Sequence, residues 1–328
     1  MSKRTIESFY KAVTPPKSKR VKPDEDLSYT HHPSYPHPIA ALPASIAESL
    51  ANIKEQTSKK ITNQPHLDLL YFHPLLPSPT ARDLFEFLRR ELPFYRVQYS
   101  IRRGGINTQI QTPRFTTVFG VDTTSTFIDS GVKDGDVNDK TSILVDSKTG
   151  QPIPKSKYQY TPRPIPSCLD TLRRSVEGAI GDGSTYNFCL VNYYATGDDS
   201  ISYHSDDERF LGPNPSIASI SLGAQRDFLM RHKPSQESGV SNQPMKFPLA
   251  SGDMVVMRGE TQSNWLHSIP KRKGGEAHKG RINITFRKAV VPGGTNNYYH
   301  YNVGSGVVHR WDEQEGKMRP EVPETKIE

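Results

Sequence analysis

The C-terminal half of the chain contains a series of short segments that restrict it to a β-rich fold. Each segment is rich in β-branched or aromatic residues, and Gly, Pro, Asp and Asn separate one from the next. Strands at this spacing predict a β-sandwich or a β-barrel. The segments are residues 186–194, 217–222, 228–232, 254–257, 265–269 and 281–287.

The last segment, residues 281–287, has two chemically different faces. Because side chains alternate along a strand, Ile282, Ile284 and Phe286 point one way and the four polar residues point the other way. Two of these polar residues, Arg281 and Arg287, keep their charge at any accessible pH and present rigid forks of donors. A ligand with a carboxylate at each end fits such a face. From this strand alone, an edge strand with a solvated basic face is the alternative.

Upstream of these strands the sequence predicts two helices and a long loop. Ser78 is expected to cap a helix whose first residue is Pro79 and which continues to Leu92. A second helix is expected over residues 166–180, where apolar residues recur at helical spacing. Residues 121–154 are polar and rich in Gly, Asp and Lys, so we expect a long loop between strands.

Residues 1–62 are expected to form a disordered basic tail, because Pro, Lys, Ser and His are frequent there and sustained periodicity is absent. Residues 1–22 contain seven basic residues and one acidic residue, and therefore carry most of the net charge of +7. The remainder of the chain is nearly neutral. Attraction of the folded part to a polyanion must then come from local clusters of basic residues.

Two short motifs lie within this tail. In residues 3–10, the side chains of Ile6, Phe9 and Tyr10 share one face of a helical turn, which resembles the box that docks replication and repair proteins on the sliding clamp. Lys3 stands where that pattern usually has Gln. Residues 15–22 resemble a nuclear-localisation cluster. The alternatives are a chance match for the first motif and a solubilising basic segment for the second.

Composition excludes several classes of protein. No apolar run is long enough to span a bilayer, and no apolar stretch follows the basic N-terminus. We therefore expect an intracellular protein that is neither secreted nor inserted in a membrane. The two cysteines, Cys168 and Cys189, can form neither a disulfide framework nor a zinc site, and we expect buried free thiols.

One spacing among the predicted strands fits metal coordination. His204 and Asp206 are two residues apart, so on an extended backbone both side chains project from the same side. Together with one distant histidine they form the three facial ligands of non-haem Fe(II) oxygenases. His267 is the best candidate, because it lies in an apolar strand shortly before residues 281–287. A His-x-Asp pair taken alone is frequent on protein surfaces, which is the alternative interpretation.

Five motifs in this order resemble the AlkB family of Fe(II)/2-oxoglutarate-dependent nucleic-acid dealkylases, in its eukaryotic DNA-repair branch. The similarity extends from about residue 113 to residue 288. Residues 113–120 and 158–160 resemble the substrate-side hairpins of the family more weakly, and the 121–154 insertion departs from the family pattern. The five motifs are residues 192–194, 204–208, 217–228, 267–270 and 281–287.

The resemblance implies a mainly β fold with some α structure, built on a double-stranded β-helix (jelly-roll) core with an N-terminal α/β extension. It implies a disordered tail over residues 1–62, a dioxygenase domain over residues 63–290 and a C-terminal extension over residues 291–328. The implied cofactors are Fe(2+), 2-oxoglutarate and O2. Iron would be held by His204, Asp206 and His267. The 2-oxoglutarate would be held by Asn192, Tyr194, Arg281, Asn283 and Arg287.

The implied reaction is the oxidative demethylation of 1-methyladenine and 3-methylcytosine in DNA, with release of formaldehyde, succinate and CO2. The base must be flipped out of the duplex or lie in a single strand. The base would be held between His204 and a tyrosine, Tyr160 in preference to Tyr158, and Arg114 would also bind the substrate. Glu208 would face the base as a catalytic and substrate-binding residue, because a carboxylate favours a cationic base over its neutral parent. The alternative is that Glu208 is an acidic residue of a solvent-exposed loop with no role in binding.

We therefore expect a monomeric, nuclear DNA-repair enzyme that docks on the sliding clamp. An RNA demethylase with the same chemistry is one alternative. A tethered module that binds damaged DNA without turnover is another. The complete set of iron and 2-oxoglutarate residues argues against the module, since a protein that had lost activity would be expected to lack at least one of them.

Overall fold

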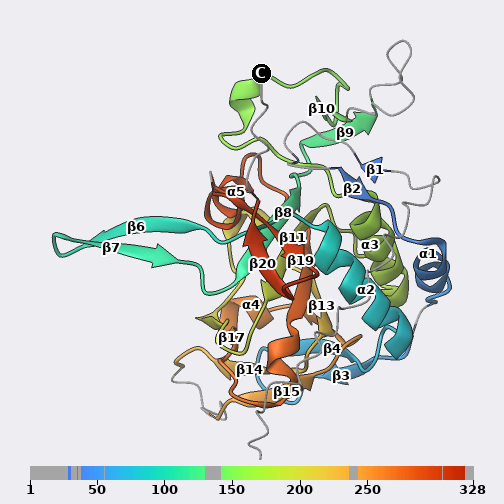
Figure 1. Ribbon diagram of the computed structural model, residues 1–328, viewed down its shortest axis with the longest axis vertical. Coiled ribbons are helices and arrows are strands. Elements are labelled where there is room, and N and C mark those ends of the chain that lie inside the picture. Colours follow the sequence, from blue (N-terminus) through green and yellow to red (C-terminus); the bar gives the residue numbers. More distant parts are fainter. Residues whose placement is uncertain are drawn as a thin grey trace, which may run out of the picture.

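Two antiparallel β-sheets of unequal size form the centre of the molecule (Figure 1). The structure is a computed structural model and describes residues 29–30, 35, 38–54, 56–129, 142–235, 243–304 and 306–321. Among these residues the larger sheet has ten strands and the smaller sheet has four. Three two-stranded hairpins and five α-helices complete the described part of the fold.

The larger sheet contains, in spatial order, β20 (Lys317–Pro320), β19 (Val308–Asp312), β5 (Phe94–Tyr95), β8 (Phe115–Gly120), β11 (Phe188–Tyr194), β18 (Arg281–Arg287), β13 (Ile217–Gly223), β16 (Met254–Arg258), β4 (Asp68–Phe72) and β3 (Lys59–Ile61). The smaller sheet contains β12 (Ile201–His204), β17 (Trp265–Ile269), β14 (Arg226–His232) and β15 (Met245–Leu249). The hairpins are β1 (Tyr29–Thr30) with β2 (Ile39–Ala40), β6 (Gln98–Arg103) with β7 (Ile106–Gln111), and β9 (Ser125–Asp129) with β10 (Ser142–Asp146). The α-helices are α1 (Ala44–Ala51), α2 (Ser78–Glu91), α3 (Ser167–Ile180), α4 (Thr261–Asn264) and α5 (Asn296–Asn302), and the short 3-10 helices are Lys155–Lys157, Arg209–Leu211 and Gly275–Lys279.

The two sheets pack face to face, and helices cover the other face of the larger sheet. Along β11, Phe188 and Leu190 belong to the hydrophobic core cluster that also contains Phe228 and Trp265 of the smaller sheet. The alternate residue Cys189 belongs to the second core cluster, beneath α1, α2 and α3 (Figure 1). This layering confirms the predicted mainly β fold with a jelly-roll core and an N-terminal α/β extension.

The two faces of β18 are divided as predicted. Ile282, Ile284 and Phe286 are fully buried in the core cluster beneath the helices. Arg281 and Arg287 face the smaller sheet instead, and they are 1% and 3% exposed. Because β18 lies between β11 and β13 in the middle of the sheet, the alternative of an edge strand with a solvated basic face is wrong.

Helices α2 and α3 confirm the two predicted helices. α2 begins at Ser78, with Pro77 in the N-cap position and no side-chain capping hydrogen bond, so the predicted cap at Ser78 is wrong by one residue. α3 ends at Ile180, where Gly181 adopts a φ of 68°. Glycine tolerates this left-handed conformation, which commonly ends helices.

The folded part of the chain begins earlier than predicted. Ile39 and Leu50 have no exposed surface and belong to the core cluster beneath the helices. α1 packs against α2 and α3. An eight-residue helix is marginal without tertiary packing, so its sequence carries little helical signal. The predicted boundary at residue 63 is therefore too late, whereas the clamp-like box and the nuclear cluster lie outside the described residues.

The segment 121–154 contains a hairpin where a long loop was predicted. β9 and β10 pair in antiparallel register, and Val145 is buried at 2% exposure. The Asp146 side chain accepts hydrogen bonds from the backbone N–H groups of Lys148 and Thr149, both at 3.0 Å, which closes the following turn. Because the segment is polar, its sequence does not indicate the two short strands that it contains. Residues 130–141 lie outside the described residues.

The C-terminal segment continues the larger sheet. β19 pairs with both β20 and β5, and Trp311 packs against the core beneath the helices. In α5, Tyr299 is 2% exposed. The predicted division at residue 291 therefore separates elements that pack into the same two core clusters.

The cysteines and the helices agree with the expectations from composition. Cys168 and Cys189 are both free and buried, as predicted. Burial raises the pKa of the Cys168 thiol to about 12, so it stays protonated at neutral pH. Among the described residues, each helix is too short or too polar to cross a membrane.

Candidate active site

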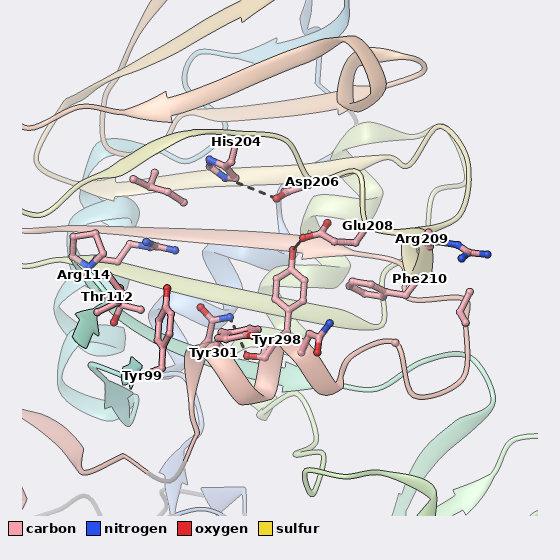
Figure 2. A pocket seen from close by; sticks show the side chains of 17 residues that line it. Tyr99, Thr112, Arg114, His204, Asp206, Glu208, Arg209, Phe210, Tyr298 and Tyr301 are labelled. Carbon is pink, nitrogen blue, oxygen red and sulfur yellow. Dashed lines mark hydrogen bonds and ion pairs between the residues drawn. The ribbon is translucent and has the colours of Figure 1, made fainter. Parts of the chain in front are cut away.

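Two histidines face each other across β12 and β17 of the smaller sheet. His204 and His267 are paired residues in the strand register, and their ring centroids are 4.2 Å apart. Asp206 places a carboxylate oxygen 3.9 Å from Nε2 of His204 (Figure 2). The three side chains each offer one ligand atom, and these atoms lie within 4.8 Å of one another. The structure thus brings together the three residues that the sequence predicts as iron ligands.

Hydrogen bonds outside this group orient its members. Nδ1 of His204 lies 2.8 Å from the carbonyl oxygen of Ser202. Because a carbonyl oxygen only accepts, Nδ1 carries the ring proton and Nε2 keeps its lone pair for a metal. The backbone N–H of Asp206 donates to Oε1 of the buried Gln262 at 2.8 Å. Sequence reasoning missed Gln262, because a lone glutamine in the four-residue helix α4 gives no signal for this contact.

Burial and neighbouring charges set the protonation of the three residues. Burial raises the pKa of Asp206, but the interaction with the Arg287 guanidinium, together with smaller contributions from His267 and His204, outweighs this effect and lowers the pKa to about 2. Burial, followed by the neighbouring His204, lowers the pKa of His267 to about 3. At neutral pH, Asp206 is therefore a carboxylate and His267 a neutral imidazole. These are the forms in which both side chains bind metals.

Arg287 connects the metal ligands to a cavity between the two sheets, which we call the inner cavity. Its Nε donates to Oδ2 of Asp206 at 3.2 Å, and both side chains are buried. Burial lowers the pKa of Arg287, but the Asp206 carboxylate raises it above its ordinary value. The sequence does not predict this ion pair, because strand spacing says nothing about contacts across the sandwich. All five predicted 2-oxoglutarate residues line the inner cavity: Asn192, Tyr194, Arg281, Asn283 and Arg287.

The hydrogen bonds and the burial of Arg281 indicate that the inner cavity suits a dicarboxylate. Its Nη2 donates to Oγ of Ser221 at 2.8 Å, and its guanidinium lies 5.3 Å from the ring centroid of Tyr194. Within the described part of the chain, its Nε and Nη1 have no hydrogen-bond partner. Burial lowers the pKa of Arg281 to about 10, so the group is charged at neutral pH. A buried cation with two unpaired donors is costly unless an anion meets it, and a carboxylate in the inner cavity does so.

Polar side chains of the two central strands hold the remainder of the inner cavity. Nδ2 of Asn283 donates to Oγ of Ser219 at 2.9 Å. Oδ1 of Asn192 accepts a hydrogen bond from Nε of Arg114 at 2.7 Å. Arg114 therefore contacts a residue of the inner cavity while it lines a second, larger one.

This second cavity, which we call the outer cavity, has a volume of about 840 Å³ (Figure 2). His204 and Asp206 line both cavities and so lie between them, whereas His267 lines the inner cavity alone. The volume is in the range of small-molecule sites. Besides the metal ligands, its lining includes three tyrosines and three charged residues: Tyr99, Tyr298, Tyr301, Arg114, Glu208 and Arg209.

A sequence model described as the 2OG-Fe(II) oxygenase superfamily matches residues 68–287. The match includes the three metal-ligand candidates and both arginines of the inner cavity. This chain belongs to the 2OG-Fe(II) oxygenase superfamily. The AlkB resemblance found in the sequence is confirmed at the level of this family.

Among its relatives of known name, this 2OG-Fe(II) oxygenase is similar to AlkB homologues. The human "DNA oxidative demethylase ALKBH2" is 41% identical over 138 residues, which are 42% of this chain and 51% of that protein. The Arabidopsis thaliana protein of the same name is 27% identical over 284 residues, covering 81% of each chain. The human "Alpha-ketoglutarate-dependent dioxygenase alkB homolog 3" is 38% identical over 141 residues, 41% of this chain and 48% of that protein. The chain thus spans about half the length of the human relatives that it matches.

Two of the predicted substrate residues of this oxygenase line the outer cavity, and two do not. Arg114 and Glu208 lie on the cavity wall. Tyr158 is buried and its hydroxyl is hydrogen-bonded within the protein, and the hydroxyl of Tyr160 is hydrogen-bonded to His300. Neither ring is part of the outer-cavity lining. The structure therefore does not place Tyr158 or Tyr160 where the predicted stacking on a base requires them.

Other tyrosines supply the aromatic wall in this oxygenase, and sequence reasoning missed them. Tyr99 comes from β6, and Tyr298 and Tyr301 come from α5. The rings of Tyr99 and Tyr301 meet edge to face with centroids 5.4 Å apart. The aromatic run at residues 298–301 was the available signal. This run predicts that residues 298–301 pack against the domain, but it does not predict against which face of the domain.

Glu208 lies between the metal ligands and this aromatic wall (Figure 2). Its Oε1 accepts a hydrogen bond from the hydroxyl of Tyr298 at 2.9 Å. Partial burial and the negative charge of Asp206 raise the pKa of Glu208. The carboxylate is therefore held at the cavity wall by a specific donor.

Proposed function

We propose that this protein removes methyl groups from alkylated bases in DNA by Fe(II)- and 2-oxoglutarate-dependent oxidation, with 1-methyladenine and 3-methylcytosine as substrates. The observation that carries the proposal is the position of the metal ligands between two unlike cavities. The inner cavity presents a buried arginine with unpaired donors, which suits a dicarboxylate. The outer cavity is large and aromatic and carries a carboxylate, which suits a cationic nucleobase.

The metal site fits Fe(II) by the chemistry of its donors. His204, Asp206 and His267 would hold the ion, and three facial ligands leave its other coordination positions free. When bound, iron and 2-oxoglutarate supply the oxidation of the methyl carbon by O2, which gives succinate, CO2 and an N-hydroxymethyl base that loses formaldehyde. The chain itself needs no nucleophile or hydrolytic dyad for this reaction.

The arginines at the two ends of β18 would bind the two carboxylates of 2-oxoglutarate. Arg287 contacts Asp206 and so belongs to the end of the inner cavity next to the metal. Arg281, with two unpaired donors, belongs to the other end. On the neighbouring strand β11, Tyr194 lies opposite Arg281 and Asn192 lies opposite Asn283, and these three polar residues, Asn192, Tyr194 and Asn283, would add hydrogen bonds.

The outer cavity would receive a single base that has left its stack, because a methyl group on the pairing edge is not accessible inside a duplex. Methylation at N1 of adenine or N3 of cytosine makes the base cationic. A carboxylate in a partly desolvated cavity favours such a base over the neutral parent, and Glu208 occupies that position. Arg114, bonded to Asn192, would hold the base close to the co-substrate.

DNA is the proposed nucleic acid and the nucleus the proposed compartment. The names of the ALKBH2 relatives support DNA, because each is called a DNA oxidative demethylase. The nuclear-localisation-like cluster at residues 15–22 supports the compartment, and the clamp-like box at residues 3–10 supports a role at replicating DNA. Both motifs lie outside the described residues and remain predictions.

The test is turnover by the full chain with Fe(II), 2-oxoglutarate and oligonucleotides that carry one 1-methyladenine. Single-stranded DNA, duplex DNA and RNA of the same sequence are compared, and the restored adenine is measured by mass spectrometry together with formaldehyde. Faster repair of DNA supports the proposal. Repair of RNA alone would establish the RNA demethylase alternative. Tight binding of methylated DNA without formaldehyde or succinate would establish the non-catalytic alternative.

A further inference from the structure

The segment after residue 287 lies beyond the superfamily match, yet it forms one side of the outer cavity. The match ends at residue 287, and α5 follows nine residues later. The helix and the loop before it contribute two tyrosines, two asparagines and one glycine to the lining of the cavity. The cavity-lining residues of α5 are Asn297, Tyr298, Tyr301 and Asn302, and Gly294 precedes the helix.

Buried hydrogen bonds fix α5 against β8 of the larger sheet. Tyr299, on the side of the helix away from the cavity, is 2% exposed and donates its hydroxyl to the carbonyl oxygen of Gly120 at 2.7 Å. Oγ1 of Thr116 donates to the carbonyl oxygen of Asn302 at 2.8 Å. The helix is therefore part of the folded core and not a loose tail.

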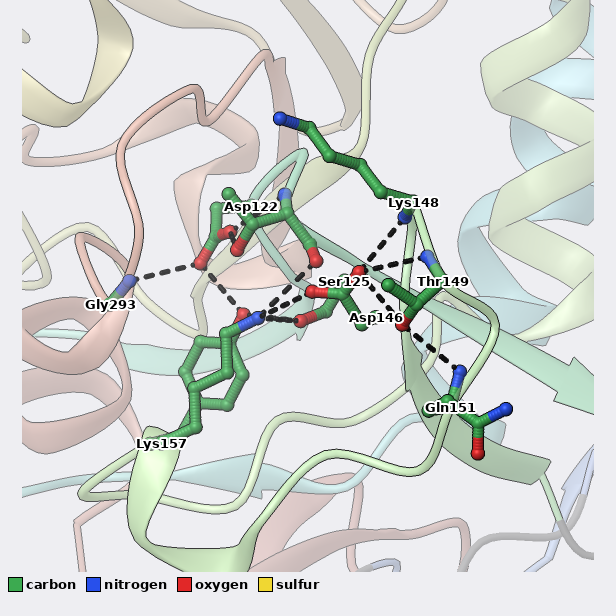
Figure 3. Close-up of polar contacts among 10 residues, drawn as sticks. Asp122, Ser125, Asp146, Lys148, Thr149, Gln151, Lys157 and Gly293 are labelled. Carbon is green, nitrogen blue, oxygen red and sulfur yellow. Dashed lines mark hydrogen bonds and ion pairs between the residues drawn. The ribbon is translucent and has the colours of Figure 1, made fainter.

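The loop before α5 is fixed in the same way. The buried carboxylate of Asp122 accepts a hydrogen bond from the backbone N–H of Gly293 at 3.0 Å (Figure 3). At the next residue, Gly294, an added Cβ would lie 2.1 Å from Cβ of Phe210, which is too close for any side chain. This loop can therefore pack against Phe210, another outer-cavity residue, only because Gly294 lacks a side chain.

With α5 fixed, two tyrosines one helical turn apart face the outer cavity (Figure 2). The hydroxyl of Tyr298 donates to Oε1 of Glu208 at 2.9 Å, and its ring centroid lies 5.5 Å from the Arg287 guanidinium. Tyr301 meets Tyr99 of β6 edge to face. Tyr298 thus contacts the carboxylate next to the metal ligands, and Tyr301 extends the aromatic wall toward the cavity mouth.

We propose that α5 is a substrate-binding element, with Tyr301 forming the wall that a flipped, cationic N-methylated base contacts. Tyr298 is a positioning residue that holds the Glu208 carboxylate toward the positive charge of that base. A glutamate side chain has several rotatable bonds, and a charge-assisted hydrogen bond from a fixed phenol selects one orientation. This inference rests on the proposed function and names the part of the chain that selects the substrate.

The first test is Tyr298→Phe, which keeps the ring and removes only the hydroxyl. We expect the ratio of kcat/KM for 1-methyladenine to kcat/KM for the neutral 1-methylguanine to fall by about tenfold, while the KM for 2-oxoglutarate stays within about twofold. The matched control is Tyr71→Phe, because Tyr71 donates to Oδ2 of Asp253 at 3.0 Å and lines neither cavity. The control is expected to leave both values unchanged.

The second test is a binding measurement on Tyr301→Ala, which does not depend on turnover. Tyr301 is 46% exposed, so the fold should tolerate the loss of its ring. We expect the affinity of the metal-loaded protein for a 1-methyladenine oligonucleotide, measured by fluorescence anisotropy, to fall by about tenfold relative to its affinity for the unmethylated strand.

The outcomes separate this inference from the proposed function. Equal losses on 1-methyladenine and 1-methylguanine, or no loss, would overturn the positioning role of Tyr298. An unchanged affinity in Tyr301→Ala would overturn the role of α5 as a wall. Absence of demethylation by the unmodified chain would instead reject the proposed function itself.

Discussion

The inner and outer cavities share two metal ligands but are built from different kinds of structure. Most of the inner cavity is lined by side chains of strands that are paired on both sides, the exceptions being the edge strand β12 and Asp206 after it, and its arginines Arg281 and Arg287 are buried. The outer cavity is lined by a β-hairpin, loops and α5, and its Tyr301 is 46% exposed. In Figure 1 the β6–β7 hairpin that carries Tyr99 projects away from the sheets.

This difference separates the chemistry from the choice of substrate. A residue on a central strand cannot move without breaking the hydrogen bonds of two neighbours, so the inner cavity is suited to hold a metal and a co-substrate in fixed geometry. Hairpins and terminal helices can vary in sequence while the sheet stays intact. We therefore expect inner-cavity substitutions to affect every reaction of the protein, and outer-cavity substitutions to affect only reactions with nucleic acid.

The largest effect is expected from the metal ligands, two of which belong to both cavities. His204→Ala, Asp206→Ala or His267→Ala should each lower demethylation by at least about a thousandfold, equivalent to about 4 kcal/mol of transition-state stabilisation. The reason is that one of three protein ligands is lost. Formaldehyde release measured with saturating Fe(II) checks this, and near-normal rates in any of these variants would contradict the metal assignment.

A smaller effect is expected at the arginines of the inner cavity. Arg281→Lys should raise the KM for 2-oxoglutarate by about tenfold, or about 1.4 kcal/mol, because an ammonium cannot replace the fork of a guanidinium. Arg287→Lys should act in the same direction. The KM is measured from succinate formation at varied 2-oxoglutarate. If both variants keep the original KM, the dicarboxylate binds elsewhere.

A selective effect is expected at Glu208 in the outer cavity. Glu208→Gln should lower kcat/KM on the cationic 1-methyladenine and 3-methylcytosine several-fold more than on the neutral 1-methylguanine and 3-methylthymine, because only the cationic bases lose an attraction to the carboxylate. Competition between lesions in one reaction gives this ratio directly. Losses of the same size on all four bases would show that Glu208 has a structural role.

The smallest effect on turnover is expected in the N-terminal tail, which lies outside the described residues. Phe9→Ala together with Tyr10→Ala should leave turnover on a free oligonucleotide unchanged. It should weaken binding of a peptide of residues 1–22 to the sliding clamp by at least about tenfold, or about 1.4 kcal/mol, since the two aromatic anchors are lost. Calorimetry measures this binding. An unmodified peptide with no affinity for the clamp would reduce the segment to a basic tail.

The sequence predicted the inner cavity well because its information is local. In β18 and in the His204–Asp206 pair, the alternation of side chains along a strand decides which residues share a face. The contact between Arg287 and Asp206 escaped prediction, since it depends on how the two sheets are stacked. The contact between Gln262 and Asp206 could not be predicted for the same reason.

The outer cavity could not be predicted from local patterns. Tyr99 and Tyr301 are distant in sequence, and they meet only because α5 packs on β8. Tyr158 resembles a substrate residue of the family, but in this chain its hydroxyl bonds to Asp122 at the base of the β9–β10 hairpin. The boundaries of the folded part were misplaced where elements are short, as in α1 and β20, because such elements form through tertiary packing rather than through their own propensity.

The most direct test of the two-cavity account measures succinate and formaldehyde in one reaction, with and without a methylated DNA oligonucleotide. With the oligonucleotide, the unmodified chain should form both products in equal amounts. His267→Ala should form neither. Glu208→Gln should keep the slow succinate formation that we expect without DNA, while losing most of the formaldehyde from 1-methyladenine. Formaldehyde from His267→Ala, or loss of DNA-independent succinate formation in Glu208→Gln, would contradict the division of roles between the cavities.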